Sequence, residues 1–287
     1  MKAKTIKKLL RAKTDEWIDS IDDEVVRNAV RKNTIITGGA IASMLINEPI
    51  NDYDIYFRDQ ETARLVAEYY VKHFPHSEGV KVSVETDRIR IVVALGYRGA
   101  TAGDVQTLSD TGEIEETFDD TKALALSADS AETKYKPIFL STNAITLSNK
   151  VQIVLRFYGE PNDIHKNYDF IHCTNYWDSV NGDLVLCQPA LESLLARELR
   201  YVGSKYPLCS VMRLRKFIKR GWSINAGQIL KMLLQVSELD LTDPKVLEDQ
   251  ITGVDSAYFI QIMECLKEKD PEKVNAAYLV EIIDRIF

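Results

Sequence analysis

One stretch of the chain, residues 34–57, constrains the fold and the chemistry more than any other. It opens with a β-branched run at residues 34–37 that is typical of a short buried strand. Gly38 and Gly39 follow, and the small apolar residues after them predict a short helix. Asp52 and Asp54 then lie inside a second apolar segment that reads as a strand. Because residues i and i+2 of a strand point to the same side, we expect these two carboxylates to project together.

The order of these features favours phosphate chemistry. Glycines lack Cβ atoms, so a phosphate can approach their backbone N–H groups closely, and a helix N-terminus adds favourable partial charge. Two neighbouring carboxylates repel each other, and Mg²⁺, which also binds phosphate oxygens, relieves that repulsion. A Gly-Gly turn or an Asp-x-Asp pair alone is usually structural. Their combination, with the acids set among apolar residues, predicts a metal and nucleotide site.

This arrangement resembles the signature of the DNA polymerase β-like nucleotidyltransferase superfamily, and most closely the head domain of tRNA CCA-adding enzymes and bacterial-type poly(A) polymerases. The matching residues are Ile36, Gly38, Gly39, Asp52 and Asp54. The chain is also similar to nucleotidyltransferase-like proteins of large tailed phages. The strong motif covers only residues 34–57, and the weaker resemblance covers about two thirds of the chain. Ala42 and Ser43 stand where CCA-adding enzymes have Arg-Asp.

The resemblance implies an α+β fold with a mixed sheet flanked by helices. It implies transfer of a nucleoside monophosphate from an NTP to a hydroxyl, with the 3′ end of an RNA such as tRNA as the expected acceptor. Gly38, Gly39 and Ser43 would contact the nucleotide, and Asp52 and Asp54 would hold two Mg²⁺ ions, with Mn²⁺ as the alternative. Two other functions stay open: nucleotidylation of a protein hydroxyl, as in toxin-like relatives, and ligand binding without catalysis on the same fold.

The family also needs a third carboxylate, and Asp169 is the first candidate. It lies in an apolar segment, residues 168–173, that reads as a strand, where an uncompensated charge is costly and a metal would offset that cost. In the alternative, Asp169 pairs with an arginine or caps the helix expected at residues 161–165. Three other carboxylates are further candidates for this role: Glu85, Asp87 and Glu160.

A basic region, residues 195–231, interrupts an acidic chain. Its only acid is Glu198, and aromatic residues alternate with its lysines and arginines. Arg213, Lys216 and Arg220 are spaced to share one helix face. We expect them to neutralise the triphosphate and to contact RNA. The alternative is a solvated helix face whose charges pair with acids elsewhere.

The pattern along the chain predicts two domains. Residues 1–188 mix helices and strands, including one helix over residues 10–32, and form the expected nucleotidyltransferase domain. Residues 96–133 lack periodicity and read as an irregular insertion, which we expect to act as a mobile flap. From residue 189 the pattern is helical to residue 287. His165 follows a proline turn and is expected at the surface.

Composition sets limits on partners and compartment. The 287 residues carry 36 Lys+Arg against 43 Asp+Glu, a net charge of −7, so any contact with nucleic acid needs a local basic patch. Four cysteines without a C-x-x-C pair argue against a disulfide framework or a zinc knuckle and favour a reducing compartment. We find no apolar segment of membrane-spanning length, no signal peptide and no P-loop. We therefore expect a cytoplasmic protein, in the bacterial host if it is phage-encoded, with no membrane partner.

Overall fold

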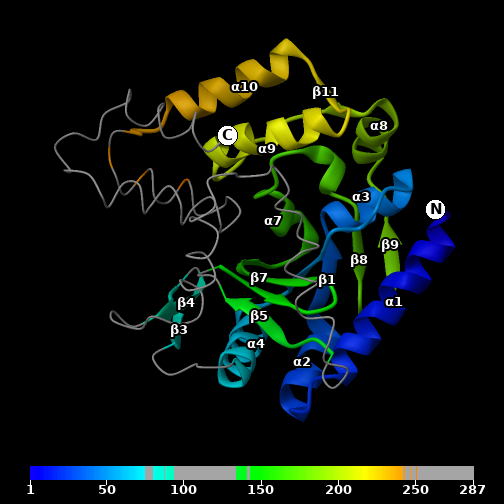
Figure 1. Cartoon of the computed structure of the whole chain (residues 1–287), viewed down its shortest axis with the longest axis vertical. Coiled ribbons are helices and arrows are strands. Elements are labelled where there is room, and N and C mark those ends of the chain that lie inside the picture. Colours follow the sequence, from blue (N-terminus) through cyan, green and yellow to red (C-terminus); the bar gives the residue numbers. More distant parts are fainter. Residues whose placement is uncertain are drawn as a thin grey trace, which may run out of the picture. The chain divides into compact units, whose positions relative to one another are not determined.

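The computed structural model describes residues 1–74, 80–86, 88–93, 134–140 and 143–241, together with residues 243, 246 and 250 (Figure 1). The chain forms two compact units. The first comprises Met1–Lys166 and His172–Leu195, and the second comprises Asn167–Ile171 and Ala196–Phe287. The domain boundary expected at residue 188 stays a prediction. The insertion expected at residues 96–133 and the last expected helices lie outside the described residues.

The first unit begins with two helices, α1 (Ala3–Asp19) and α2 (Glu24–Asn33). The single helix predicted over residues 10–32 is therefore wrong. The helical pattern of apolar residues runs through Asp23, but the helix does not. The side chain of Asp23 accepts hydrogen bonds from two backbone N–H groups in the first turn of α2 and so starts a new helix. An aspartate in this capping position stabilises a new helix start more than it would stabilise the interior of a longer helix.

The described part of the first unit contains a seven-stranded mixed sheet, with the strand order β5-β6-β7-β2-β1-β8-β9. In chain order the strands are β1 (Thr34–Thr37), β2 (Tyr53–Phe57), β5 (Pro137–Leu140), β6 (Ala144–Leu147), β7 (Val151–Tyr158), β8 (Tyr176–Asp178) and β9 (Asp183–Val185). Strands β2 and β7 are parallel and the other neighbours are antiparallel. The expected α+β class and mixed sheet are confirmed. The sequence pattern did not reveal β5 or β8.

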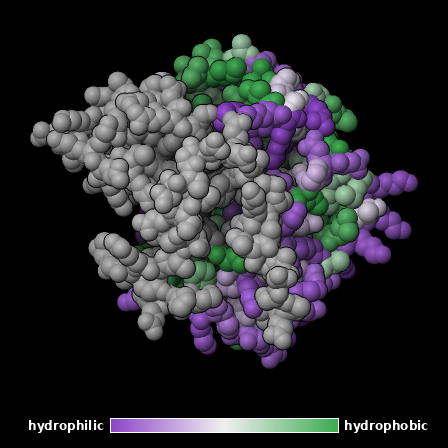
Figure 2. Space-filling model, in the orientation of Figure 1, coloured by the Kyte–Doolittle hydropathy of each residue, from purple (hydrophilic) through white to green (hydrophobic). Residues whose placement is uncertain are grey.

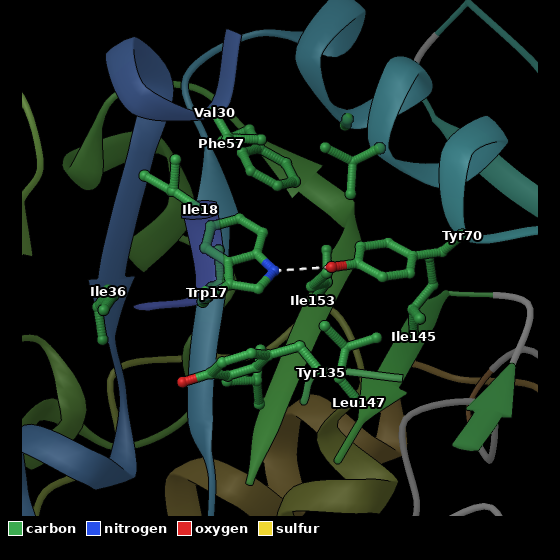
Figure 3. Packing of buried hydrophobic residues seen from close by; sticks show 14 of the residues in the cluster. Trp17, Ile18, Val30, Ile36, Phe57, Tyr70, Tyr135, Ile145, Leu147 and Ile153 are labelled. Carbon is green, nitrogen blue, oxygen red and sulfur yellow. Dashed lines mark hydrogen bonds between the residues drawn. The ribbon is translucent and has the colours of Figure 1, made fainter. Parts of the chain in front are cut away.

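The core lies on one face of this sheet. Side chains that alternate along the central strands, such as Ile36, Ile55 and Ile153, are fully or almost fully buried in one cluster with residues of the covering helices. Figure 3 shows Trp17 of α1 directed toward Tyr70, and the indole Nε1 donates a hydrogen bond to the tyrosine hydroxyl at 2.8 Å. The intervening side chains of the strands therefore point to the opposite face.

The remaining elements of the first unit surround the sheet. They are α3 (Gly39–Ile46), α4 (Gln60–His73), β3 (Val80–Val84), β4 (Ile89–Val93), α7 (Pro161–His165) and α8 (Gln188–Ala196), whose last residue lies in the second unit. Strands β3 and β4 form a separate antiparallel pair. Asp59 caps α4, because its carboxylate accepts a hydrogen bond from the Thr62 backbone N–H at 2.7 Å.

The strand predicted at residues 168–173 is wrong. Phe170 makes only an isolated antiparallel bridge with Tyr201, and Ile171–Cys173 forms a 3₁₀ turn. The apolar run that suggested a strand is instead explained by ring packing. The Phe170 ring packs edge-on against Tyr201 and Phe217, with centroids 6.0 and 5.5 Å away.

The second unit contains the helices α9 (Pro207–Lys219) and α10 (Ala226–Ser237). The predicted helical character of this region is confirmed for both segments. Two short strands, β10 (Glu198–Leu199) and β11 (Ser223–Ile224), also pair in parallel, which helical periodicity did not predict.

Helix α10 buries Met232 together with part of two glutamine side chains and leaves four large apolar side chains exposed. Gln228 accepts a hydrogen bond from the Tyr201 backbone N–H at 2.8 Å, and Gln235 accepts one from the Tyr201 hydroxyl. The opposite side of the helix carries exposed apolar residues: Ile229, Leu230, Leu233 and Leu234. Figure 2 shows hydrophobic surface over the helix that Figure 1 labels α10.

Among the described residues, no helix is both long enough and apolar enough to cross a membrane.

Candidate functional site

The end of β1 and the start of β2 bring the glycines and the aspartates of the motif to one edge of the sheet. The two strands are antiparallel, and Thr37 lies directly opposite Asp54. Gly38 and Gly39 follow Thr37, while Asp52 precedes β2 by one residue. The glycine turn and the carboxylate pair, separated by twelve residues or more in sequence, are therefore neighbours in the fold.

The two glycines have different roles. Gly38 has φ 95° and ψ −151°, a conformation that only glycine adopts without strain, and its N–H donates to the Cys173 carbonyl at 3.1 Å. Gly39 is the first residue of α3, is exposed, and has no atom within 4 Å of the position where a Cβ would lie. A phosphate would thus meet Gly39 and the free N–H groups of the first helical turn, while Gly38 shapes the turn.

Asp52 and Asp54 are both half-buried. Asp54 lies between Thr37 of β1 and Gln152 of β7, its register partners on the two neighbouring strands. Partners in register point to the same face, so this face carries polar side chains where the other face carries the core. Within the part of the chain that the structure describes, no cluster of three or more His, Cys, Asp or Glu residues is arranged to hold a metal ion. Two carboxylates nevertheless suit Mg²⁺, which commonly completes its shell with water and substrate phosphates.

His165 contacts this site, and the expectation that it lies at the surface is wrong. It is half-buried at the end of α7, and its Nε2 lies 2.8 Å from the Thr37 hydroxyl oxygen. That hydroxyl also lies 2.9 Å from the Asn175 carbonyl and 3.3 Å from the Cys173 carbonyl, which only accept hydrogen bonds. The single hydroxyl proton therefore goes to a carbonyl, and His165 donates from Nε2.

The protonation state of His165 agrees with this network. Burial lowers the pKa of His165 from 6.5 to about 4, so the imidazole is neutral at physiological pH. With the proton on Nε2, the ring holds Thr37, the residue immediately before the glycine turn. The sequence signal for this contact was weak, because 128 positions separate the two residues.

Asp169 belongs to the second unit and is paired there with an arginine. Its carboxylate accepts a hydrogen bond from the Arg213 guanidinium at 2.7 Å and another from the Phe170 backbone N–H at 2.9 Å. The side chain of Asp169 is 12% exposed and that of Arg213 is 47% exposed. The arginine-paired alternative thus describes Asp169 in this structure. Its service as a metal ligand stays a prediction, and that service would require the carboxylate to exchange Arg213 for the metal.

The other candidate carboxylates also have basic neighbours. Glu85 pairs with Arg88 at 2.6 Å, and Glu160 pairs with Arg58 at 3.1 Å. Asp87 lies outside the described residues.

The remaining predicted nucleotide-binding residues lie on helices. Ser43 is half-buried in α3, where its carbonyl accepts the backbone N–H of Asn47. Arg213 and Lys216 lie on α9, Arg220 caps its C-terminus, and all three are exposed. The shared helix face predicted for them is consistent with α9, and their contact with a nucleotide stays a prediction.

Structural comparison finds similar folds among CCA-adding enzymes, the group that the motif resembles. One is the Thermotoga maritima CCA-adding enzyme complexed with tRNA, with a TM-score of 0.40 and 13% identity over 90% of this chain and 51% of that chain. Another is the Bacillus stearothermophilus enzyme in complex with CTP, with a TM-score of 0.38 and 13% identity over 86% of this chain and 50% of that chain.

Sequence comparison gives a family. A protein named Gabija anti-defense 2, from Bacillus phage SPbetaL7, is 20% identical over 252 residues, which are 87% of this chain and 49% of that protein. The chain thus spans about half the length of this relative. The model of the Gabija anti-defense 2 family matches residues 8–197, which include the glycine turn, Asp52, Asp54 and His165. Since that match covers well over half of its residues, the chain belongs to the Gabija anti-defense 2 family.

Proposed function

We propose that this protein is a Mg²⁺-dependent nucleotidyltransferase that moves a nucleoside monophosphate from an NTP to a hydroxyl acceptor. The observation that carries the proposal is the register of β1 and β2. It sets Asp54 opposite Thr37 and so puts the carboxylates beside the glycine turn and the start of α3. A triphosphate and a divalent cation need these two sets of groups at one place.

Each residue has a defined task in this proposal. Gly39 and the first turn of α3 bind the β- and γ-phosphates, and Gly38 keeps the turn open. Asp52 and Asp54 hold Mg²⁺, as two ions or with Mn²⁺ in its place. Bound there, the metal supplies positive charge that favours ionisation of the acceptor hydroxyl and departure of pyrophosphate. The hydroxyl oxygen bonds to the α-phosphorus while the bond to pyrophosphate breaks.

Asp169, Arg213, Lys216 and Arg220 complete the proposal from the second unit. Asp169 would serve as third ligand and accept the hydroxyl proton, and the basic residues of α9 would neutralise the triphosphate. The ion pair between Asp169 and Arg213 supports a link between metal binding and triphosphate binding. If Asp169 turns to the metal, Arg213 needs another anion, and the triphosphate would supply it.

The acceptor we favour is the 3′ end of an RNA such as tRNA, on the basis of the motif's resemblance to CCA-adding enzymes. The family description favours a second candidate, a hydroxyl on a protein. A transfer enzyme that acts against a bacterial defence system would gain from modifying one of its components directly. Both versions place the protein in the cytoplasm of an infected bacterium. Ligand binding without catalysis is the third possibility.

A transfer assay separates these three. The purified protein is incubated with each α-labelled NTP and Mg²⁺, with total tRNA in one arm and a total bacterial protein extract in another. Label on RNA supports the favoured acceptor, and label on a protein band supports the second. Nucleotide binding without label in either arm would overturn the enzymatic proposal.

A further inference from the structure

A second polar site lies in the first unit, on the face of the sheet opposite Asp54. It is a cavity of about 390 Å³ between α1, the end of α2 and strand β8 with the residues after it. Trp177 of β8 lines this cavity, whereas its neighbour Tyr176 is the register partner of Thr37. Successive residues of a strand point to opposite faces, so the cavity is separate from the site described above.

Basic side chains dominate the lining of this cavity. Arg11 of α1 and Arg31 and Lys32 of α2 contribute three cations, against the single carboxylate of Asp15. Arg31 lies 3.8 Å from Asp19, an exposed and loose pair. Within the described part of the chain, neither Arg11 nor Lys32 forms an ion pair. The cavity thus carries a net positive charge, because Asp15 and Asp19 offset only part of the charge of the three cations.

The guanidinium of Arg11 lies against the turn after β8. Gly182 is buried with φ 65°, and a Cβ at this position would overlap Nη2 of Arg11. The absence of a side chain at Gly182 therefore lets the guanidinium lie across the turn at the cavity. A guanidinium packed in this way loses less conformational freedom when it binds a ligand.

Two polar atoms at this cavity are buried without a partner. Among the described residues, Nε1 of Trp177 and Oγ of Ser179 have no hydrogen bond, although Trp177 is only 2% exposed. Buried polar atoms are nearly always satisfied in folded proteins, so each exception calls for an explanation. Both atoms are shielded from solvent, so a ligand that accepts hydrogen bonds would satisfy them only once the side chains that cover them shift.

We propose that this cavity binds a phosphate group. The indole, guanidinium and ammonium groups can only donate hydrogen bonds, which requires a ligand rich in acceptor oxygens. Guanidinium groups match the oxygens of phosphate in pairs. Three cations and two further polar atoms exceed what the two oxygens of a carboxylate can use, whereas a phosphate offers more. The phosphate belongs either to a free nucleotide or inorganic phosphate, or to the backbone of a nucleic acid.

Binding measurements in phosphate-free, Mg²⁺-free buffer test this site without any turnover. Inorganic phosphate, AMP and a short single-stranded RNA are titrated against the full chain by calorimetry. The variant Arg11→Gln removes a cation that lines the cavity, and Lys4→Gln removes a cation of the same helix that does not line it. We expect at least about tenfold weaker binding of the preferred probe by Arg11→Gln and less than about twofold change for Lys4→Gln.

Each outcome has a defined reading. Loss of phosphate or AMP binding in Arg11→Gln supports a small-ligand site, and loss confined to the RNA supports a backbone site. A second variant, Trp177→Phe, keeps an aromatic side chain but replaces the indole with a phenyl ring and so removes Nε1, and it should weaken binding of the same probe; its melting temperature is measured alongside, because Trp177 belongs to the core. The proposal is overturned if the wild-type chain binds none of the probes, or if Lys4→Gln weakens binding as much as Arg11→Gln. Because the assay needs neither Mg²⁺ nor Asp52 and Asp54, its result is independent of the proposed transferase activity.

Discussion

The two faces of the central sheet use alternate residues of the same strands for opposite purposes. On one face Ile36, Ile55 and Ile153 are buried among the helices. On the other face Thr37, Asp54 and Gln152, each next to one of these residues in sequence, form a row of polar side chains beside the glycine turn. A strand period of two residues thus lets one short segment specify both the core and the candidate site. Substitutions on the core face should therefore lower stability, whereas substitutions on the polar face should lower transfer activity.

The largest effect is expected from the carboxylate pair. Asp52→Asn combined with Asp54→Asn should abolish nucleotide transfer and leave the fold intact, because amides keep the shape and remove the repulsion. Mg²⁺ should raise the melting temperature of the wild type, since it binds only the native arrangement, and should not raise that of the double variant. Asp183→Asn, an exposed acid on β9, serves as the control. Retained transfer in the double variant would refute the metal assignment.

Neighbouring residues of β7 give the sharpest contrast in stability. Ile153→Ala should lower the free energy of unfolding by about 2–5 kcal/mol, because it empties a fully buried position. Gln152→Ala should cost less than about 1 kcal/mol, yet lower transfer activity because Gln152 is the register partner of Asp54. Urea unfolding and transfer assays on both variants check this. Equal losses of stability would mean that the polar face is also structural.

The two glycines separate turn geometry from phosphate binding. Gly38→Ala should cost about 1–3 kcal/mol of stability, because φ 95° with ψ −151° is strained for any residue with a Cβ. Gly39→Ala should leave stability unchanged or slightly raised, since its Cβ would meet no atom. If a phosphate lies against Gly39, the same change should raise the KM for NTP about tenfold, by analogy with the loss of one charge-assisted hydrogen bond. An unchanged KM for NTP would mean that the phosphate does not bind at this turn.

Substitution of Asp169 tests whether the metal site proposed at Asp52 and Asp54 needs a third carboxylate from outside the sheet. Asp169→Asn should lower stability by about 1–3 kcal/mol, because Arg213 and the Phe170 N–H lose a charged acceptor. If Asp169 also binds metal, the Mg²⁺ concentration for half-maximal transfer should rise in Asp169→Asn but not in Arg213→Met. Should the Mg²⁺ requirement stay the same in both variants, Asp169 is only the partner of Arg213.

The smallest effect concerns pH and His165. With its pKa lowered to about 4 by burial, His165 stays neutral in the folded state while the unfolded chain binds a proton below about pH 6.5. The unfolded state thus binds more protons between these values, and stability falls as pH drops through this window. His165→Gln keeps a donor for Thr37 but cannot titrate, so its stability should fall less, by a difference on the order of 1 kcal/mol after solvent screening. Parallel pH profiles of wild type and variant would contradict this role.

Local elements were predictable where one sequence signal dominated. The strand at residues 34–37 and the short helix after the glycines each follow from a strong nearby pattern, and the structure confirms them. The continuous helix over residues 10–32 failed because the capping strength of Asp23 outweighed an apolar period that runs through it. The strand predicted over residues 168–173 does not form. The apolar Phe170 in this run packs instead against the rings of Phe217 on α9 and of Tyr201.

The sequence by itself determined which residues carry the candidate chemistry, because Gly-Gly followed by Asp-x-Asp combines groups with local physical requirements. Only the tertiary structure decided which other residues lie next to them. His165 contacts Thr37 across 128 positions, and Arg213 contacts Asp169 across 44. Trp177 and Arg11, from distant parts of the first unit, line the same cavity. Such contacts depend on strand order and helix packing, which arise from the summed burial of many side chains. No single local pattern encodes that sum.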